Sequence, residues 1–249
     1  MAGLGVAGEY FGHLIEHREC ARAIVAHTEQ ALRPEARKHV VNGFVDHLEH
    51  KSIFINGLEV FHLRKRDYTL QQMMDYIQAI PAVYHPKIVI HSHFQLLSYF
   101  DLKGVHFSKQ YTLEHFKNES SEELWNLVCK KHISLSVHSL NDILKLEQVY
   151  NYVFISPVFD SISNRGYNAK IKIKTFQKFL ETPNRKVKVI ALGGIKEDNI
   201  PLAFATGFDG VAMLGYIWNE FAQNKNVDLG IERFKQIQRL LKLVEYPIG

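Results

Sequence analysis

The chain has 249 residues, 46% of them hydrophobic and 22% charged, a composition typical of a globular protein and not of a disordered or fibrous one. Its formal net charge of +4 comes from Lys and Arg residues scattered among acids, which argues against a nucleic-acid-binding protein. Two cysteines are too few for a disulfide framework, and no apolar run approaches the roughly 20 residues of a membrane span. These totals predict a soluble, cytoplasmic, single-domain protein whose partners are neither nucleic acids nor membranes.

Residues 1–38 are expected to form an N-terminal extension with one amphipathic helix. Its apolar stripe consists of Phe11, Leu14, Ile15, Ile24, Val25 and Leu32. A packing or dimer-capping helix is its ordinary interpretation, so a homodimer is compatible with the sequence. The second expected unit, a barrel domain, spans residues 39–249.

From residue 57 onward, short apolar or β-branched runs alternate with longer amphipathic segments, which is the pattern of βα units around a parallel sheet. Seven strands are predicted, at 59–63, 87–91, 104–107, 134–137, 152–156, 187–192 and 210–214. The helical run at 230–244 is expected to pack outside them and close the ring. The length and pattern predict an α/β fold, a (β/α)8 TIM barrel.

A closed barrel needs one more strand before residue 59, and its position is ambiguous. The run at 40–45 fits by spacing, because residues 46–56 could then supply the first crossover helix. The same residues also fit a helical stripe, and periodicity alone does not separate the two for short apolar runs. The first strand therefore stays an open prediction.

Glycines follow the last two predicted strands. Gly193 and Gly194 end one apolar run, and Leu214 and Gly215 end the next. In α/β barrels, the loops after the seventh and eighth strands commonly share one phosphate between backbone amides and a helix N-terminus. These four residues are predicted to bind phosphate, which indicates an enzyme of phosphorylated small molecules.

Six short motifs at strand ends appear in order: His62-Leu63-Arg64-Lys65, Gly104-Val105-His106, Ser136-Val137-His138-Ser139-Leu140, Ser156-Pro157-Val158-Phe159, Ala191-Leu192-Gly193-Gly194-Ile195 and Asp209-Gly210-Val211. Together they resemble the thiamine phosphate synthase and thiazole tautomerase family. The resemblance implies a (β/α)8 barrel of thiamine biosynthesis with its active site at the C-terminal ends of the strands. It also implies a phosphorylated thiazole as substrate and, in the synthase, a pyrimidine diphosphate as well.

The chain departs from the synthase pattern where Mg²⁺ would be held. The pattern has an Asn-Asp pair after the third strand and an Asp after the fourth, where this chain has His91-Ser92 and Tyr111. Neither Ser92 nor Tyr111 offers an anionic oxygen at neutral pH. Other departures are His62 for a glutamine, Arg66 for a lysine, and Ser161-Ile162-Ser163-Asn164 for a Thr-x-Thr-Lys loop. A synthase would need Mg²⁺ on unfamiliar ligands.

The tautomerase branch needs a phosphate anchor and one group that moves a proton near neutral pH, and no cofactor. His138 matches the family's acid/base histidine, although the motif also occurs in synthases. The sequence therefore favours tautomerase-like proton transfer, with synthase and a non-catalytic phosphate-ligand binding protein as alternatives. The residues expected to bind substrate are His62, Arg64, His91, His106, Ser136, Ser161 and Ser163.

Five histidines, His62, His91, His93, His106 and His138, fall at or near strand ends and could converge on the barrel mouth. No ligand-spacing motif supports a metal, so none is predicted. His106 is expected to be a hydrogen-bonded residue of the upper barrel layer. Of the neighbours Arg64 and Lys65, only one can face the interior, and Arg64 is expected there, binding an anion.

Overall fold

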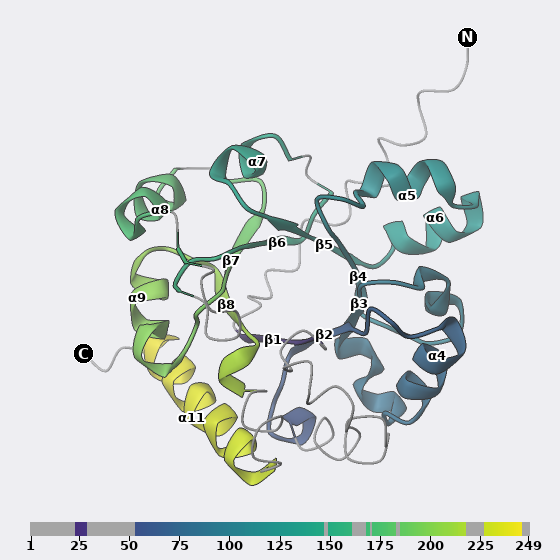
Figure 1. Ribbon diagram of the computed structural model, residues 1–249, viewed down its shortest axis with the longest axis horizontal. Coiled ribbons are helices and arrows are strands. Elements are labelled where there is room, and N and C mark those ends of the chain that lie inside the picture. The colour runs from purple at the N-terminus through teal and green to yellow at the C-terminus, as the bar shows by residue number, and fades with distance from the viewer. Residues whose placement is uncertain are drawn as a thin grey trace.

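The computed structural model describes residues 23–28, 53–146, 149–160, 168–169, 171–182, 185–217 and 227–245. In these residues, parallel strands β1 to β8 close into a barrel in the order of the sequence. Figure 1 shows the strands as a central ring with helices around it. The predicted (β/α)8 barrel is confirmed.

The strands are β1 Ala23–Thr28, β2 Val60–Arg64, β3 Ile88–Ile90, β4 Gly104–Phe107, β5 His132–Val137, β6 Tyr152–Ile155, β7 Lys188–Leu192 and β8 Gly210–Met213. Strands β2 to β8 agree with the seven predicted strands to within about two residues at each end, because their apolar runs are bounded by turn residues and helical segments. Parallel pairing continues around the whole barrel and returns from β8 to β1.

The first strand is where the prediction from sequence was wrong. β1 pairs with β2 and with β8, so that Ile24 lies opposite both Val60 and Ala212. Ile24 and Val25 therefore belong to the barrel and not to a helical extension, and the expected domain boundary after residue 38 cuts off a barrel strand. The competing candidate at 40–45, like the rest of residues 1–22 and 29–52, lies outside the described residues. The closure of the barrel explains why residues 23–28 form a strand. Without it, the N–H and C=O groups along one edge of β2 and one edge of β8 would have no strand partner.

Alternation along the strands separates the barrel interior from the helix-facing side. A small apolar cluster fills the interior and comprises Val60, Val89, Tyr152, Phe154, Ile190 and Ala212. The next inward positions on β2 and β4 are His62 and His106, which are 0% and 4% exposed. Since successive side chains of a strand point to opposite faces, Phe61 and Leu63 pack instead in the large cluster under the helices. The interior thus changes from apolar to polar toward the C-terminal mouth.

The helices around the barrel are α4 Leu70–Gln78, α5 Leu113–Glu119, α6 Glu122–Cys129, α7 Leu140–Leu144, α8 Ile173–Leu180, α9 Ile200–Ala205 and α11 Val227–Glu245. Several begin at side-chain caps: Thr69 forms a capping box with Gln72 before α4, and Ser121 accepts from the Leu124 amide before α6. The predicted closing helix is α11, which buries Phe234, Ile237 and Leu241. Among the described helices, none has the length and apolar character to cross a membrane.

An ion pair ties β7 to β8 at their N-terminal ends, away from the mouth. Asp209, which directly precedes β8, accepts hydrogen bonds from Arg185 Nη1 at 2.7 Å and Nη2 at 3.2 Å. Its Oδ2 also accepts from the Val189 amide at 2.8 Å, so the carboxylate links the start of β8 to β7 and to the residues just before β7. Such charge-assisted, two-pronged pairs are stronger than ordinary surface pairs.

We expect Asp209→Ala to lower the free energy of unfolding by about 2 kcal/mol, because it leaves a half-buried guanidinium and a strand amide without their acceptor. Urea denaturation measures this change. The matched control is Asp101→Ala, which removes an exposed carboxylate that pairs with Lys131 at 2.6 Å. It should cost less than about 1 kcal/mol. Equal losses in the two variants would contradict the structural role of Asp209.

Candidate active site at the barrel mouth

The loop after β7 is built from two glycines in left-handed conformations, with φ of 92° at Gly193 and 66° at Gly194. A Cβ on Gly193 would lie 2.8 Å from Pro157 Cα and 3.2 Å from Ser156 Oγ. Only glycine therefore allows the loop after β6 to pack against this turn. Whether this loop binds phosphate stays a prediction.

Side chains hold this glycine loop in place. Asn199 donates to the Gly194 carbonyl oxygen at 2.8 Å and accepts from the Lys196 amide at 2.9 Å. The loop after β8 carries Leu214 and Gly215, and residues 215–217 are helical. The Tyr216 hydroxyl donates to Glu197 at 3.2 Å, so a direct hydrogen bond joins the two loops that are predicted to share a phosphate.

His138 follows β5 and is exposed at the same end of the barrel, since all eight strands run parallel. Its Nδ1 lies 3.0 Å from the Ser156 carbonyl oxygen. A carbonyl can only accept, so Nδ1 carries a proton, and in the neutral imidazole the lone pair is on Nε2. Ser156 also lies against Gly193, as its Oγ distance shows. His138 and the glycine loop thus share one mouth, with an imidazole nitrogen able to take up a proton.

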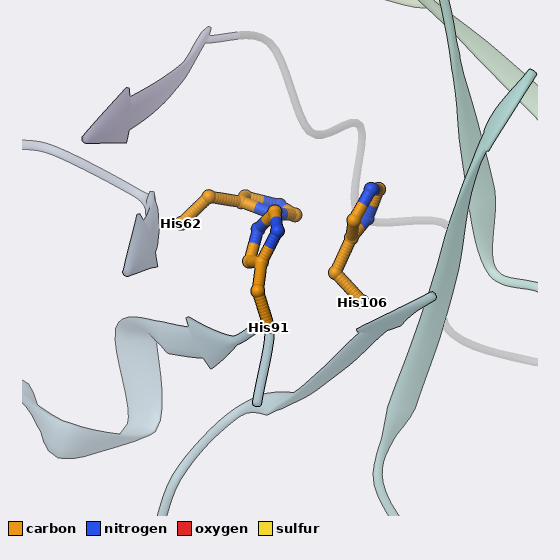
Figure 2. Close-up of side chains that lie close together, drawn as sticks. All are labelled: His62, His91 and His106. Carbon is orange, nitrogen blue, oxygen red and sulfur yellow. The ribbon is translucent and has the colours of Figure 1, made fainter. Parts of the chain in front are cut away.

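Three of the predicted substrate-binding histidines come together in the barrel interior. His62 on β2, His91 just after β3 and His106 on β4 bring their rings close to one another (Figure 2). His62 Nδ1 lies 3.0 Å from His91 Nε2, and the ring centroids of His91 and His106 are 4.3 Å apart. The expected convergence is confirmed for these three.

Each of these imidazoles is held neutral by its surroundings. Burial lowers the pKa of His62 and of His91 well below the ordinary value, and the neighbouring histidines lower it further. Burial, together with the Arg64 guanidinium, lowers the pKa of His106 to about 3. His106 is hydrogen-bonded to Ser134 at 2.8 Å and to Ser136 at 2.7 Å, which confirms the expectation for this residue.

Arg64 and Lys65 take opposite sides, as alternation predicts. Arg64 is two residues after the inward-facing His62 on β2, so alternation places it on the interior side, where its charge lowers the pKa of His91 and of His106. Lys65 is 1% exposed, and its ammonium lies 5.2 Å from the Tyr68 ring and 5.1 Å from the Tyr76 ring. Whether Arg64 binds an anion stays a prediction.

Of the remaining predicted residues, some lie in the histidine cluster, some lie away from it, and some lie outside the described part of the chain. Ser136 contacts the histidine cluster through His106, whereas His93 turns away and bonds the Tyr68 carbonyl oxygen through Nε2 at 2.8 Å. Ser161 and Ser163 lie outside the described residues. The sequence did not single out Tyr152, whose hydroxyl lies 2.6 Å from His62 Nε2, or Asn199 as a loop-positioning residue. The period-2 pattern of β6 was the available signal for Tyr152, because it places that side chain inside the barrel.

The donor set at the mouth does not fit the Mg²⁺ site that a synthase implies. Position 92 is a serine, and the Tyr111 hydroxyl is turned to Glu119 on α5, to which it donates at 2.9 Å. The interior groups next to them are neutral imidazoles, whereas Mg²⁺ prefers carboxylate and water oxygens. The described residues at these positions therefore do not form the magnesium site of a synthase.

Comparison with known proteins agrees with the fold. The family described as thiamine monophosphate synthase matches residues 25–217. The chain belongs to the thiamine monophosphate synthase family. The match begins within β1, which agrees with the corrected position of the first strand.

Relatives in this family carry the synthase name. The thiamine-phosphate synthase of Listeria welshimeri is 22% identical over 80% of this chain and 92% of its own length. That of Dictyoglomus thermophilum is 22% identical over 76% of this chain and 85% of its own. The thiamine phosphate pyrophosphorylase of Bacteroides thetaiotaomicron superposes with a TM-score of 0.68 at 27% identity, covering 89% of this chain and 98% of that one. These names indicate an enzyme and support the synthase alternative better than the tautomerase that the sequence favoured.

Proposed function

We propose that the protein is a thiamine phosphate synthase, which binds a thiazole phosphate at the barrel mouth and joins it to a pyrimidine diphosphate. The choice of reaction rests on membership of the family and on the names of its relatives. The geometric support for the site is the contact of Ser156 with both His138 and Gly193, which brings an imidazole beside a glycine loop suited to a phosphate.

In this proposal the phosphate of the thiazole lies on the loops after β7 and β8, which Tyr216 and Glu197 hold together. The reaction displaces pyrophosphate, so the site must stabilise negative charge on the departing group. Arg64, on the interior side of β2, is the cation of this chain that we assign to that task. Mg²⁺ would supply the same stabilisation in the family pattern, but the residues described above do not offer its usual ligands.

A second reaction, aromatisation of a dihydrothiazole carboxylate phosphate, has two observations in its favour. His138 donates from Nδ1 to the Ser156 carbonyl oxygen, so its neutral imidazole has the lone pair on Nε2, the form that a general base needs. Proton transfer also requires no divalent cation, in keeping with serine and tyrosine at positions 92 and 111.

The two reactions separate in a direct assay with the purified protein. We expect thiamine phosphate to form from the two phosphorylated halves, which chromatography with fluorescence detection measures. We expect His138→Ala to leave this coupling within about tenfold, because displacement of pyrophosphate needs charge stabilisation and not a proton shuttle. If the protein is a tautomerase, the same substitution should slow aromatisation by a factor of at least about 100.

His93→Ala is the matched control, because His93 is also near the mouth but bonds the Tyr68 carbonyl oxygen. It should change neither rate. Aromatisation without coupling would replace the synthase by the tautomerase. Binding of the thiazole phosphate without either reaction, measured by calorimetry, would leave a non-catalytic binding protein.

A further inference from the structure

The proposed reaction makes no use of the mutual arrangement of His62, His91 and His106. One ring nitrogen from each of these residues lies within 4.8 Å of the others. They come from three successive strands or strand ends, so the barrel backbone fixes their spacing (Figure 2). The three neutral imidazoles thus bring nitrogen donors together at one point of the barrel interior.

The spacing of the first pair suits a shared metal ion. Two nitrogens bound to one tetrahedral zinc ion at about 2.0–2.1 Å lie roughly 3.3 Å apart. His62 Nδ1 and His91 Nε2 are 3.0 Å apart and already face one another across a hydrogen bond. A cation that replaces the shared proton needs only a small widening of this pair. His106 is near both, with ring centroids 5.1 Å from His62 and 4.3 Å from His91.

Hydrogen bonds from His62 and His106 to neighbouring hydroxyls can fix the tautomer of each ring. His62 Nε2 lies 2.6 Å from the Tyr152 hydroxyl, a partner that can accept its proton and leave Nδ1 with a lone pair. The Ser134 hydroxyl donates to the Val105 carbonyl oxygen and so can accept from His106 Nδ1. The lone pair is then on Nε2, where the Ser136 hydroxyl lies at 2.7 Å and a cation would have to displace it. Outer hydrogen bonds that fix the tautomer and orientation in this way are a regular feature of histidine metal sites.

We propose that His62, His91 and His106 form a binding site for a divalent cation of the zinc class. Three neutral imidazoles are an established ligand set for zinc, with a fourth position left to water or to an anionic oxygen. Nitrogen donors of this kind favour zinc, cobalt or nickel over magnesium, which takes oxygen ligands. The site therefore differs in ligands and metal from the carboxylate magnesium site of the family pattern, although His91 occupies one position of that pattern's Asn-Asp pair.

One charged group works against the cation. The Arg64 guanidinium acts on both His91 and His106, and it would repel a dication as it repels a proton there. An anionic oxygen in the fourth position would offset this repulsion, because it would lie between the metal and the mouth. Arg64 and the three histidines then form a single receptor for a cation and its anion.

The test uses the full chain, freed of metal by a chelator and then dialysed. We expect it to bind about one equivalent of Zn²⁺, measured by elemental analysis after gel filtration. Co²⁺ should give the intense visible absorption of a four-coordinate ion, which reports the coordination geometry, and the histidine variants then identify the ligands. His91→Ala is the primary variant, because His91 is the least buried of the three, and it should weaken zinc binding at least 100-fold. His106→Gln should have the same effect while keeping a polar group beside Ser134 and Ser136.

His93→Ala is the matched control, two residues from His91 but outside the cluster, and it should bind zinc as the unchanged protein does. Circular dichroism establishes that each variant is folded. The proposal is overturned if the unchanged protein binds no zinc at micromolar concentration, or if folded His91→Ala and His106→Gln retain it, which would place the metal on other histidines. Loss of zinc in His93→Ala as well would also overturn it. Because the readout is bound metal, failure of the synthase assay leaves this result unaffected.

Discussion

Gly194→Ala should lower the free energy of unfolding by roughly 3 kcal/mol, through backbone strain and overpacking together. The residue has φ of 66°, and an added Cβ would overlap the Asp160 carbonyl oxygen and lie 2.7 Å from the Phe159 carbonyl carbon. The neighbours are backbone atoms of the loop after β6, which can give way only if the two loops separate. Urea denaturation measures the stability, and calorimetry should show that binding of the thiazole phosphate is weakened at the same time.

Gly57→Ala is the control that separates strain from overlap. Gly57 also has a left-handed backbone, with φ of 94°, but a Cβ there would meet nothing within 4 Å. The control should therefore lose only the conformational part, about 1–2 kcal/mol, and should bind ligand normally. Equal stability losses in the two variants would show that overlap with the loop after β6 does not contribute to the destabilisation by Gly194→Ala.

Acidification should destabilise the metal-free protein well above the pH at which most carboxylates titrate. Burial lowers the pKa of His62 and His106 in the folded state, while the same groups titrate near 6.5 in the unfolded chain. Below that pH the unfolded chain binds protons that the folded barrel excludes, so stability is complete above about pH 6.5 and falls as the pH drops. Each excluded proton contributes a slope of about 1.4 kcal/mol per pH unit, so His106 alone should account for a loss of about 2 kcal/mol between pH 6 and pH 4.

Denaturation midpoints at a series of pH values, with a chelator present, measure this dependence. His106→Gln removes one titrating ring and keeps a neutral side chain able to hydrogen-bond to the adjacent serines. Its stability should therefore fall less steeply, by about 1.4 kcal/mol per pH unit, than that of the unchanged protein. Parallel pH profiles for the two proteins would show that His106 is not kept neutral by the barrel.

The fold was predictable where an apolar run of strand length was bounded by turn residues. β2 to β8 are apolar runs of strand length bounded by turns, so their existence followed from the sequence. β1 did not, because Ile24 and Val25 also fit the apolar stripe of a helix, and the pairing that decides between the two involves strands far away in the sequence. The local hydrophobic pattern does not show which strands of the sheet still lack a neighbour.

The candidate site was predictable to the level of strand ends and no further. The glycines after β7 and the histidine after β5 stood out because backbone freedom and proton transfer belong to particular residue types. The meeting of His62, His91 and His106 was expected only in outline. Their ligand-like spacing depends on how β2, β3 and β4 stagger around the barrel, whereas sequence motifs for metals rely on short separations within one segment. The hydroxyl of Tyr152 beside His62 depends on the same long-range geometry.

The pairing of Asp209 with Arg185 has a bearing on how this protein could have diverged. This ion pair joins β7 and β8 at the N-terminal end of the barrel, whereas the glycine loop and the histidines lie toward the C-terminal end. Amino-acid replacements in the upper loops can then accumulate under selection without loosening the scaffold. Because the ion pair is separate from these loops, acidic metal ligands at the mouth could be replaced by serine, tyrosine and histidine during evolution. The reaction could then change while the barrel kept its stability.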